Sequence, residues 1–349
     1  MQEPSKLPAT NSTLKRLLLA WYDTHRRILP WRALPGEASD PYRVLVSELM
    51  LQQTTVKTVE PRFRLFVDRF SDIRALAGAS IDDVLHAWQG LGYYRRARGL
   101  HRAASEIVDR HGGHIPQDVE ALEQLSGIGS YTARAVAAIA FEKPVVPVDG
   151  NVRRVLSRLA ALDGPANELG RSVAFVAREL ETDHRPGDTA QALMELGALC
   201  CRPARPACER CPWRNDCRAF ALGKQEALPR PATKPARRHL HATAWLARRN
   251  DGAILFRKRP DNGLLGGLIE LPSSPWSEEN GLVAPDFGSD FHAMEGSVIH
   301  IFTHIHLDMR LMTGRCETFS EGFFQSPDRL DELALPTLTK KLLRHGGIG

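Results

Sequence analysis

Residues 122–141 read LEQLSGIGSYTARAVAAIAF, and they place a tight turn between two helical stretches. Gly127 and Gly129 lie in this turn, where the absence of a side chain lets backbone N–H groups approach a neighbour closely. The helix expected after Gly129 presents its N-terminus at the turn, and helix N-termini bind anions. A DNA phosphate is a natural ligand for such a site, held without reading base sequence. We therefore predict a phosphate-binding hairpin over residues 117–140, with an ordinary helical corner as the alternative.

Two carboxylates lie on either side of this hairpin in the sequence. Glu48 stands in VSELMLQQTTV (residues 46–56), surrounded by apolar residues, although acids are rarely buried without a partner. Asp149 directly precedes the helix expected from Gly150, where it could be a plain N-cap. Glu48 could instead lie on the exposed stripe of an amphipathic helix and have no functional role. A carboxylate near a phosphate-binding turn can also do more than cap a helix.

Four of the six cysteines form the sharpest local pattern. They lie in CRPARPACERCPWRNDC (residues 201–217) with the spacing C-x6-C-x2-C-x5-C. Thiolates at this density predict a metal site in an intracellular protein. Structural zinc and a [4Fe–4S] cluster both accept four cysteines, so the spacing leaves the metal open. The predicted ligands are Cys201, Cys208, Cys211 and Cys217.

The chain divides into two parts of different character. Apolar spacing near 3.6 residues predicts a helical domain over residues 1–222. Residues 223–238 are rich in proline and basic residues and predict a linker. Residues 239–349 contain alternating and β-branched stretches, which predict a mixed domain with a sheet. The fold class is therefore multidomain, an all-α domain followed by an α+β domain.

Charge and hydropathy limit the class of partner. The chain has 46 basic and 41 acidic residues, and the excess falls in the first domain and the linker, which fits a polyanionic partner. No apolar run approaches the ~18 residues that a membrane-spanning helix needs. The N-terminus does not resemble a secretory signal. We expect no membrane association and a cytoplasmic, nucleoid-associated location.

Taken together, these motifs resemble the helix-hairpin-helix DNA glycosylases, and five further segments resemble the adenine DNA glycosylase (MutY) branch. The five are LPWR (29–32), SELMLQQT (47–54), GLGYYRRARGL (90–100), VDGNVRRVLSR (148–158) and ELGALCC (195–201). The resemblance implies a glycosylase that flips adenine, mispaired with 8-oxoguanine or guanine, out of double-stranded DNA and hydrolyses its N-glycosidic bond. It also implies that the cysteines hold a [4Fe–4S] cluster. We expect the protein to act as a monomer.

The resemblance carries roles onto individual residues. Glu48 would be the general acid that protonates adenine, and Asp149, oriented by Asn151, would stabilise the positive charge on the sugar. The residues implied to contact the flipped base or the opposite strand are Trp31, Arg32, Leu51, Gln53, Thr54, Leu91, Tyr93 and Gln191. Tyr131 stands where the related endonuclease III branch has its Schiff-base lysine, so a monofunctional enzyme is expected.

The second domain resembles the Nudix fold. Glu278 and Glu279 stand alone where that fold has a dense glutamate motif for catalytic metal, so we expect no hydrolase activity. The resemblance to the adenine glycosylase branch implies instead that a short loop with Phe302, Thr303 and His304 recognises 8-oxoguanine, with a buried strand as the alternative. Two other functions stay open, an endonuclease III-like glycosylase/lyase for oxidised pyrimidines and a non-catalytic lesion-binding protein.

Overall fold

The computed structural model describes residues 10–232, 236–260 and 263–348. They form two compact units, Met1–Gly78 with Gly99–Thr233 and Ala79–Arg98 with Lys234–Gly349. The helical and sheet-containing parts expected from the sequence are both present. Residues 233–235 of the predicted linker and residues 1–9 of the N-terminus lie outside the described residues.

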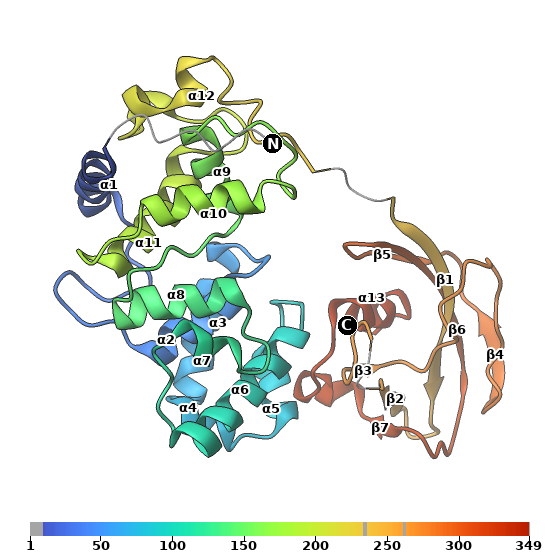
Figure 1. The fold of residues 1–349 in the computed structure, drawn as a ribbon. Coiled ribbons are helices and arrows are strands. Elements are labelled where there is room, and N and C mark those ends of the chain that lie inside the picture. Colours follow the sequence, from blue (N-terminus) through green and yellow to red (C-terminus); the bar gives the residue numbers. More distant parts are fainter. Residues whose placement is uncertain (1–9, 233–235, 261–262, 349) are drawn as a thin grey trace. The chain divides into compact units, whose positions relative to one another are not determined.

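Helices joined by loops make up the described part of the first unit, with one isolated β-bridge between Pro165 and Arg230 (Figure 1). Its α-helices are α1 (Asn11–His25), α2 (Pro41–Leu51), α3 (Val56–Arg69), α4 (Ile73–Ala77), α6 (Arg95–His111, shared with the second unit), α7 (Val119–Glu123), α8 (Ser130–Phe141), α9 (Gly150–Leu159), α10 (Gly170–Glu179), α11 (Pro186–Glu195) and α12 (Arg218–Ala221). A π-helical turn, Leu196–Cys200, extends α11, and two short 3-10 turns, Cys208–Arg210 and Arg214–Asp216, lie in the cysteine loop.

Apolar spacing near 3.6 residues predicts one helical run from Val44 to Phe70, but the structure has two helices there. Helix α2 starts at Asp40, whose side chain accepts hydrogen bonds from the Tyr42 and Arg43 N–H groups, and Pro41 suits the first turn. The helix ends where Gln53 takes a left-handed conformation, with φ of 59°. The chain then restarts as α3, so residues 52–55 become a loop at the end of α2.

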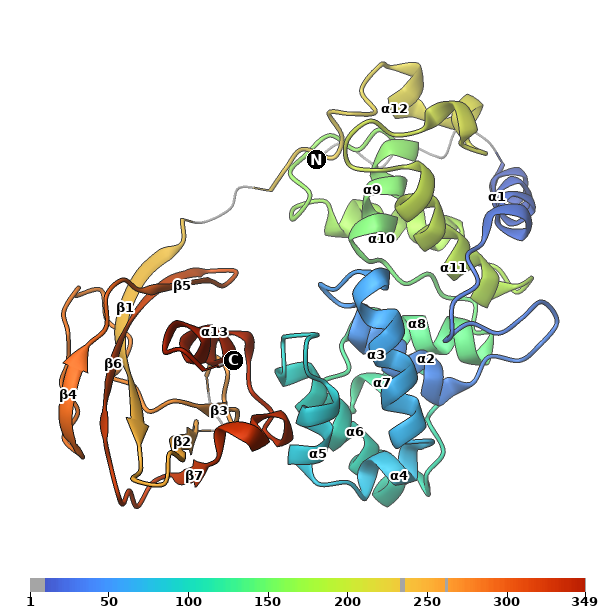
Figure 2. The same ribbon diagram turned by 180° about the vertical axis from the view of Figure 1, so that it is seen from behind.

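The apolar core of the first unit holds these helices in place. Helices α1, α9, α10 and α11 share one cluster that also contains Cys200 and Trp213. Helix α2 packs between α3 and α8, an arrangement visible from both sides in Figures 1 and 2. The hairpin helix α8 therefore lies directly against the helix that carries Glu48.

The second unit contains α5 (Ile81–Ala87). In the sequence Ser80 precedes this segment with Asp83 three residues on, a pattern that predicts a helix N-terminus, and Ser80 Oγ accepts from the Asp83 N–H at 3.1 Å. Its strands are β1 (Arg238–Arg248), β2 (Ile254–Lys258), β3 (Ile269–Glu270), β4 (Ser289–Ala293), β5 (Val298–Ile301), β6 (Ile305–Arg315) and β7 (Phe323–Gln325), followed by a 3-10 turn (Pro327–Glu332) and α13 (Thr337–His345). None of the helices in the described ranges has the length and apolar character that a membrane crossing needs.

The sheet is mixed and has the order β3-β2-β1-β6-β4, with β5 pairing to β6 and β7 to β2. Its centre is a parallel pair, β1 and β6, in register from Arg238 with Ile305 to Arg248 with Arg315. Helix α13 covers one face through Leu338, Leu342 and Leu343 (Figure 2). Strands β5 and β6 are antiparallel, and residues 302–304 form the loop between them, so the alternative of a continuous buried strand is wrong.

Candidate active site

A cavity of about 1080 Å³ lies in the first unit, at the ends of α2, α8 and α9. It collects most of the predicted site residues of that unit from distant parts of the sequence. These are Trp31, Arg32, Glu48, Leu51, Gln53, Thr54, Gly127, Gly129, Tyr131, Asp149, Asn151 and Gln191. Leu91 and Tyr93 belong to the second unit.

Glu48 is buried, with 6% of its surface exposed, so the interpretation of an exposed helical stripe is wrong. Its Oε2 accepts a hydrogen bond of 2.7 Å from the Tyr131 hydroxyl. Burial raises the pKa of Glu48 to about 7, with nearby Asp149 adding to the rise and Tyr131 and Arg32 opposing it. The carboxyl group can therefore hold a proton near neutral pH.

Tyr131 lies in the first turn of α8 and remains a phenol. Burial, together with the charges of Glu48 and Asp149, raises its pKa well above the usual value. A neutral phenol can donate to one oxygen of Glu48 and leaves the other oxygen available for chemistry.

Asp149 is the N-cap of α9, as that reading of the sequence predicted, and its side chain also lines the cavity. Its Oδ1 accepts from the Val152 N–H at 2.6 Å, and its Oδ2 accepts from Asn151 Nδ2 at 3.1 Å. Burial raises the pKa of Asp149, while these donors and Arg154 oppose the rise by favouring the carboxylate. Asn151 is itself held by Arg154, whose Nη2 donates to Asn151 Oδ1 at 2.8 Å.

The two hairpin glycines differ in what they make possible. Gly127 has φ of 77°, and a Cβ there would meet Gly99 Cα at 2.7 Å, so this glycine lets the turn pack against α6. Gly129 has open space around it and lies on the cavity wall as the N-cap of α8. Gly99 was not predicted, because only the packing of α6 on the turn reveals its role.

Sequence reasoning also missed residues on the cavity wall and behind it. Arg27 and Met194 line the cavity, and the buried Glu195 forms ion pairs with Arg27 and Arg32. Helix α11 supplies Gln191 and Met194 to the wall, and Met194 Sδ lies 3.9 Å from the Tyr131 hydroxyl. The sequence contained a signal for Met194 and Glu195, because residues three and four positions after Gln191 lie on the same face of a helix.

The cysteine loop packs against the end of α9. Arg158 is buried and donates from Nη1 to Cys201 Sγ at 3.4 Å. Burial and the nearby Cys201, Cys211 and Cys217 raise the pKa of Cys208, so the four thiols lie near enough to act on one another. Within the described ranges, no group of three or more His, Cys, Asp or Glu side chains has an arrangement that could hold a metal ion. The donor set itself, four thiols beside a buried cation, fits an iron–sulfur cluster chemically.

Phe302, Thr303 and His304 form the loop between β5 and β6 rather than a buried strand. The Phe302 N–H donates to the Ile305 carbonyl at 2.8 Å, which closes the turn, and Thr303 and His304 are exposed. Phe302 stacks on Trp276 and anchors the loop to the sheet. Within the same unit, the Tyr93 hydroxyl lies 3.1 Å from Thr303 Oγ1. This loop therefore presents two polar side chains to solvent.

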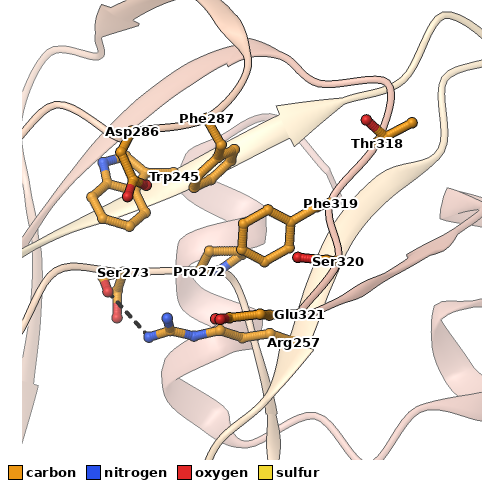
Figure 3. A pocket seen from close by; sticks show the side chains of 10 residues that line it. All are labelled: Trp245, Arg257, Pro272, Ser273, Asp286, Phe287, Thr318, Phe319, Ser320 and Glu321. Atoms are coloured by element: carbon orange, nitrogen blue, oxygen red, sulfur yellow. Dashed lines mark hydrogen bonds between the residues drawn. The ribbon is translucent and has the colours of Figure 1, made fainter.

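The second unit also has a shallow cavity of about 820 Å³, shown in Figure 3. Trp245, Phe287 and Phe319 form its aromatic wall, and Arg257 on its floor hydrogen bonds to the Ser273 carbonyl. The predicted residues of the second unit lie elsewhere, and Arg257 is already paired with Glu270. The cavity therefore has no link to the predicted chemistry.

Known protein families match both the helical part and the sheet-containing part of the chain. Residues 46–172 match the family model of the HhH-GPD superfamily base excision DNA repair protein, and residues 243–345 match the NUDIX domain. A solved thermostable thymine-DNA glycosylase aligns with a TM-score of 0.55 at 26% identity, over 61% of this chain and 97% of its own.

Sequence relatives extend across nearly the whole chain. The adenine DNA glycosylase of Mus musculus is 37% identical over 352 residues, 83% of this chain and 68% of the relative. That of Schizosaccharomyces pombe is 30% identical over 405 residues, 94% of this chain and 88% of the relative. The chain, with its paired carboxylates in one cavity, therefore belongs to the adenine DNA glycosylase family, the N-glycosylases of base excision repair.

Proposed function

We propose that this adenine DNA glycosylase acts on double-stranded DNA in which adenine is paired with 8-oxoguanine or guanine. The observation that carries the proposal is the convergence of Glu48 and Asp149, which lie about 100 residues apart in the sequence, on one cavity with Tyr131. A non-catalytic lesion-binding protein would need neither a protonated acid nor a paired anion. Adenine inside the duplex is out of reach, so the base must flip into the cavity.

Glu48 is the general acid in this proposal. Tyr131 occupies Oε2, so the proton resides on Oε1 and moves from there to adenine N7, which turns neutral adenine into a better leaving group. The departing base leaves an oxocarbenium-like sugar. Asp149, held by the Val152 N–H and Asn151, stabilises this positive charge or attacks it to form a transient adduct. Water then attacks the sugar and completes the hydrolysis. Tyr131 stands where a lyase would have a lysine amine, so no Schiff base forms.

The flipped adenine is proposed to lie against Trp31, Arg32, Leu51 and Gln191. All four line the cavity, and Gln191 is buried with an amide that can pair with a base edge. Gln53 and Thr54 lie in the loop after α2, and with Leu91 and Tyr93 they are proposed to contact the DNA beside the lesion. The hairpin turn at Gly127 and Gly129 holds a phosphate.

The assay that tests the proposal uses a duplex with a single A:8-oxoguanine pair. We expect strand breakage after treatment with alkali, because a monofunctional enzyme leaves an abasic site. Strand breakage without alkali would instead favour an endonuclease III-like lyase. A strand that stays intact in both conditions would favour a protein that only binds lesions.

A [4Fe–4S] cluster held by Cys201, Cys208, Cys211 and Cys217 is part of the proposal, and its support is the four-thiol loop and family membership. Such a cluster fixes the loop and, when bound, supplies a redox-active centre. The loop contacts α1 through Trp213, whose Nε1 donates to the Leu14 carbonyl at 2.9 Å. Ligation of the loop is therefore expected to affect folding of the whole unit.

We expect the purified protein to be brown and to contain about four irons per chain, as a cubane cluster on four cysteines requires. Cys201→Ala should lower both iron content and soluble yield. Cys316→Ala is the control, because Cys316 is a buried cysteine of the second unit. Colourless protein with stoichiometric zinc would show that the cluster assignment is wrong.

The second unit is proposed to recognise 8-oxoguanine with the 302–304 loop. The N7 atom carries a hydrogen in 8-oxoguanine but not in guanine, and Thr303 Oγ1 can accept from it. His304 is exposed beside it and can contact a phosphate or O8. The proposed boundaries are residues 1–222 for the glycosylase domain, 223–238 for the linker and 239–349 for the recognition domain. We propose that the chain acts as a monomer at the nucleoid.

Thr303→Ala alone should weaken the preference for 8-oxoguanine slightly, because a net hydrogen bond contributes ~0.5–1.5 kcal/mol. Thr303→Ala with His304→Ala should weaken it strongly and leave adenine release from A:G pairs little changed. The measurement is the ratio of excision rates on A:8-oxoguanine and A:G duplexes. His292→Ala, an exposed histidine of β4, is the matched control. An unchanged ratio in the double variant would mean that the loop has only a structural role.

A further inference from the structure

Glu195 is a fully buried carboxylate that the proposed reaction does not use. It ends α11 directly before the π-helical turn. Its Oε2 lies 2.9 Å from Arg27 Nε, and its Oε1 lies 2.5 Å from Arg32 Nη1. A buried carboxylate is costly unless it is paired, and here one carboxylate holds two guanidinium groups.

The position of Glu195 links these pairs to the reaction. Arg27 and Arg32 both line the cavity with Glu48, whereas Glu195 lies behind them on the face of α11 that also carries Gln191. The Arg32 side chain is 13% exposed, so solvent screens its charge only weakly. Arg32 also donates from Nη1 to the Arg27 carbonyl at 3.3 Å. Glu195 therefore determines where two cations point.

The direction of those cations matters because Glu48 must keep its proton. The ionisable groups that act on Glu48 are Tyr131 from α8, Asp149 at the start of α9 and Arg32 from the loop before α2. A guanidinium that turned from Glu195 to Glu48 would hydrogen bond to the ionised carboxylate and favour it. The acid would then be lost at neutral pH, although every residue that contacts substrate was still present.

We propose that Glu195 is a positioning residue that holds Arg27 and Arg32 away from the general acid and aims them at the flipped base. The inference rests on the proposed role of Glu48. Arginine has only donors, so groups fixed in this way can meet acceptor nitrogens of adenine and discriminate against bases that present donors there. Glu195 thereby separates two tasks, binding the base and protonating it, that share one cavity.

The test is the pH profile of single-turnover excision by Glu195→Gln on an A:8-oxoguanine duplex. The rate should decrease at high pH as Glu48 loses its proton, and we call this part of the profile the falling limb. In Glu195→Gln we expect the falling limb to lie about one pH unit lower, so that the rate drops roughly tenfold near pH 8 and little near pH 5.5. A purely structural role would lower the rate by the same factor at every pH. A profile that keeps its shape would therefore overturn the proposal.

Two further variants separate the outcomes. Glu195→Asp keeps the charge and should restore the wild-type limb, even where its maximal rate is lower. Glu270→Gln is the matched control, since Glu270 is also buried between two arginines, Arg257 and Arg259, but in the second unit. Its pH profile should equal that of the unaltered protein.

The proposal stays testable if Glu195→Gln does not fold. Arg32→Gln removes the cation instead of its anchor, so its residual activity should show the limb moved to higher pH. A limb that stays or moves lower would overturn the proposal. Glu48→Gln distinguishes this inference from the proposed function. If Glu48→Gln is inactive and the Glu195 and Arg32 variants leave the limb in place, only the positioning role is wrong.

Discussion

Glu48→Gln is expected to slow adenine release by about a hundredfold to ten-thousandfold, the range that general acid catalysis contributes. Glutamine keeps the shape of the side chain and can still accept the Tyr131 hydrogen bond, but it has no proton to give. Binding to an A:8-oxoguanine duplex should stay near the unaltered level. The measurements are single-turnover excision and an equilibrium binding titration on the same duplex.

The matched control for this variant is Glu142→Gln. Glu142 lies in the same unit, and burial also raises its pKa, but it is outside the cavity lining. It should excise adenine at an unchanged rate. Substantial single-turnover cleavage by Glu48→Gln would place the acid on another residue.

The raised pKa of Glu48 gives this prediction a pH dependence with a definite sign. Glu48 is protonated below about pH 7 and ionised above it, so excision should fall as pH rises through 7. Folding raises the pKa of Glu48 from its ordinary value of 4.5 to about 7. Between these two pH values Glu48 is protonated in the folded chain and ionised in the unfolded chain. Its contribution to folding stability is therefore complete below 4.5 and lost as pH rises through 7, by roughly 3 kcal/mol. Urea unfolding of Glu48→Gln should lack this loss.

Asp149→Asn should slow excision by about a hundredfold to a thousandfold, the effect of removing one preorganised electrostatic partner of a transition state. Asparagine caps helices as well as aspartate does, so α9 should keep its N-cap bond to the Val152 N–H. Only the negative charge facing the sugar is lost. Single-turnover excision gives the rate, and thermal unfolding checks that the fold is retained.

Asp72→Asn provides the control for the loss of charge at a helix N-cap. Asp72 caps α4 and accepts from the Arg74 and Ala75 N–H groups, both at 2.9 Å, and it lies outside the cavity. Its rate should be unchanged. An Asp149→Asn rate close to that of Asp72→Asn would mean that Asp149 is a cap without a catalytic role.

Local sequence was sufficient for several elements because their determinants are adjacent in the chain. The Gly127–Gly129 turn requires a positive φ next to a helix N-terminus, the Ser80 cap requires an oxygen three residues before a free N–H, and the cysteine spacing is a property of a single loop. Each of these can be read from fewer than about twenty consecutive residues, a scale at which periodicity and capping signals operate.

Sequence patterns were enough to predict the helical and mixed domains, the glycine turn and the cysteine loop, and the resemblance of the motifs indicated the family. The fold was needed to show that Glu48 is buried against Tyr131, that Asp149 is both an N-cap and part of the cavity wall, and that Glu195 pairs with Arg27 and Arg32. The break after α2, at Gln53, also escaped prediction. The physical reason is that burial and charge pairing join residues from separate elements, and their energies depend on distances that no local pattern encodes.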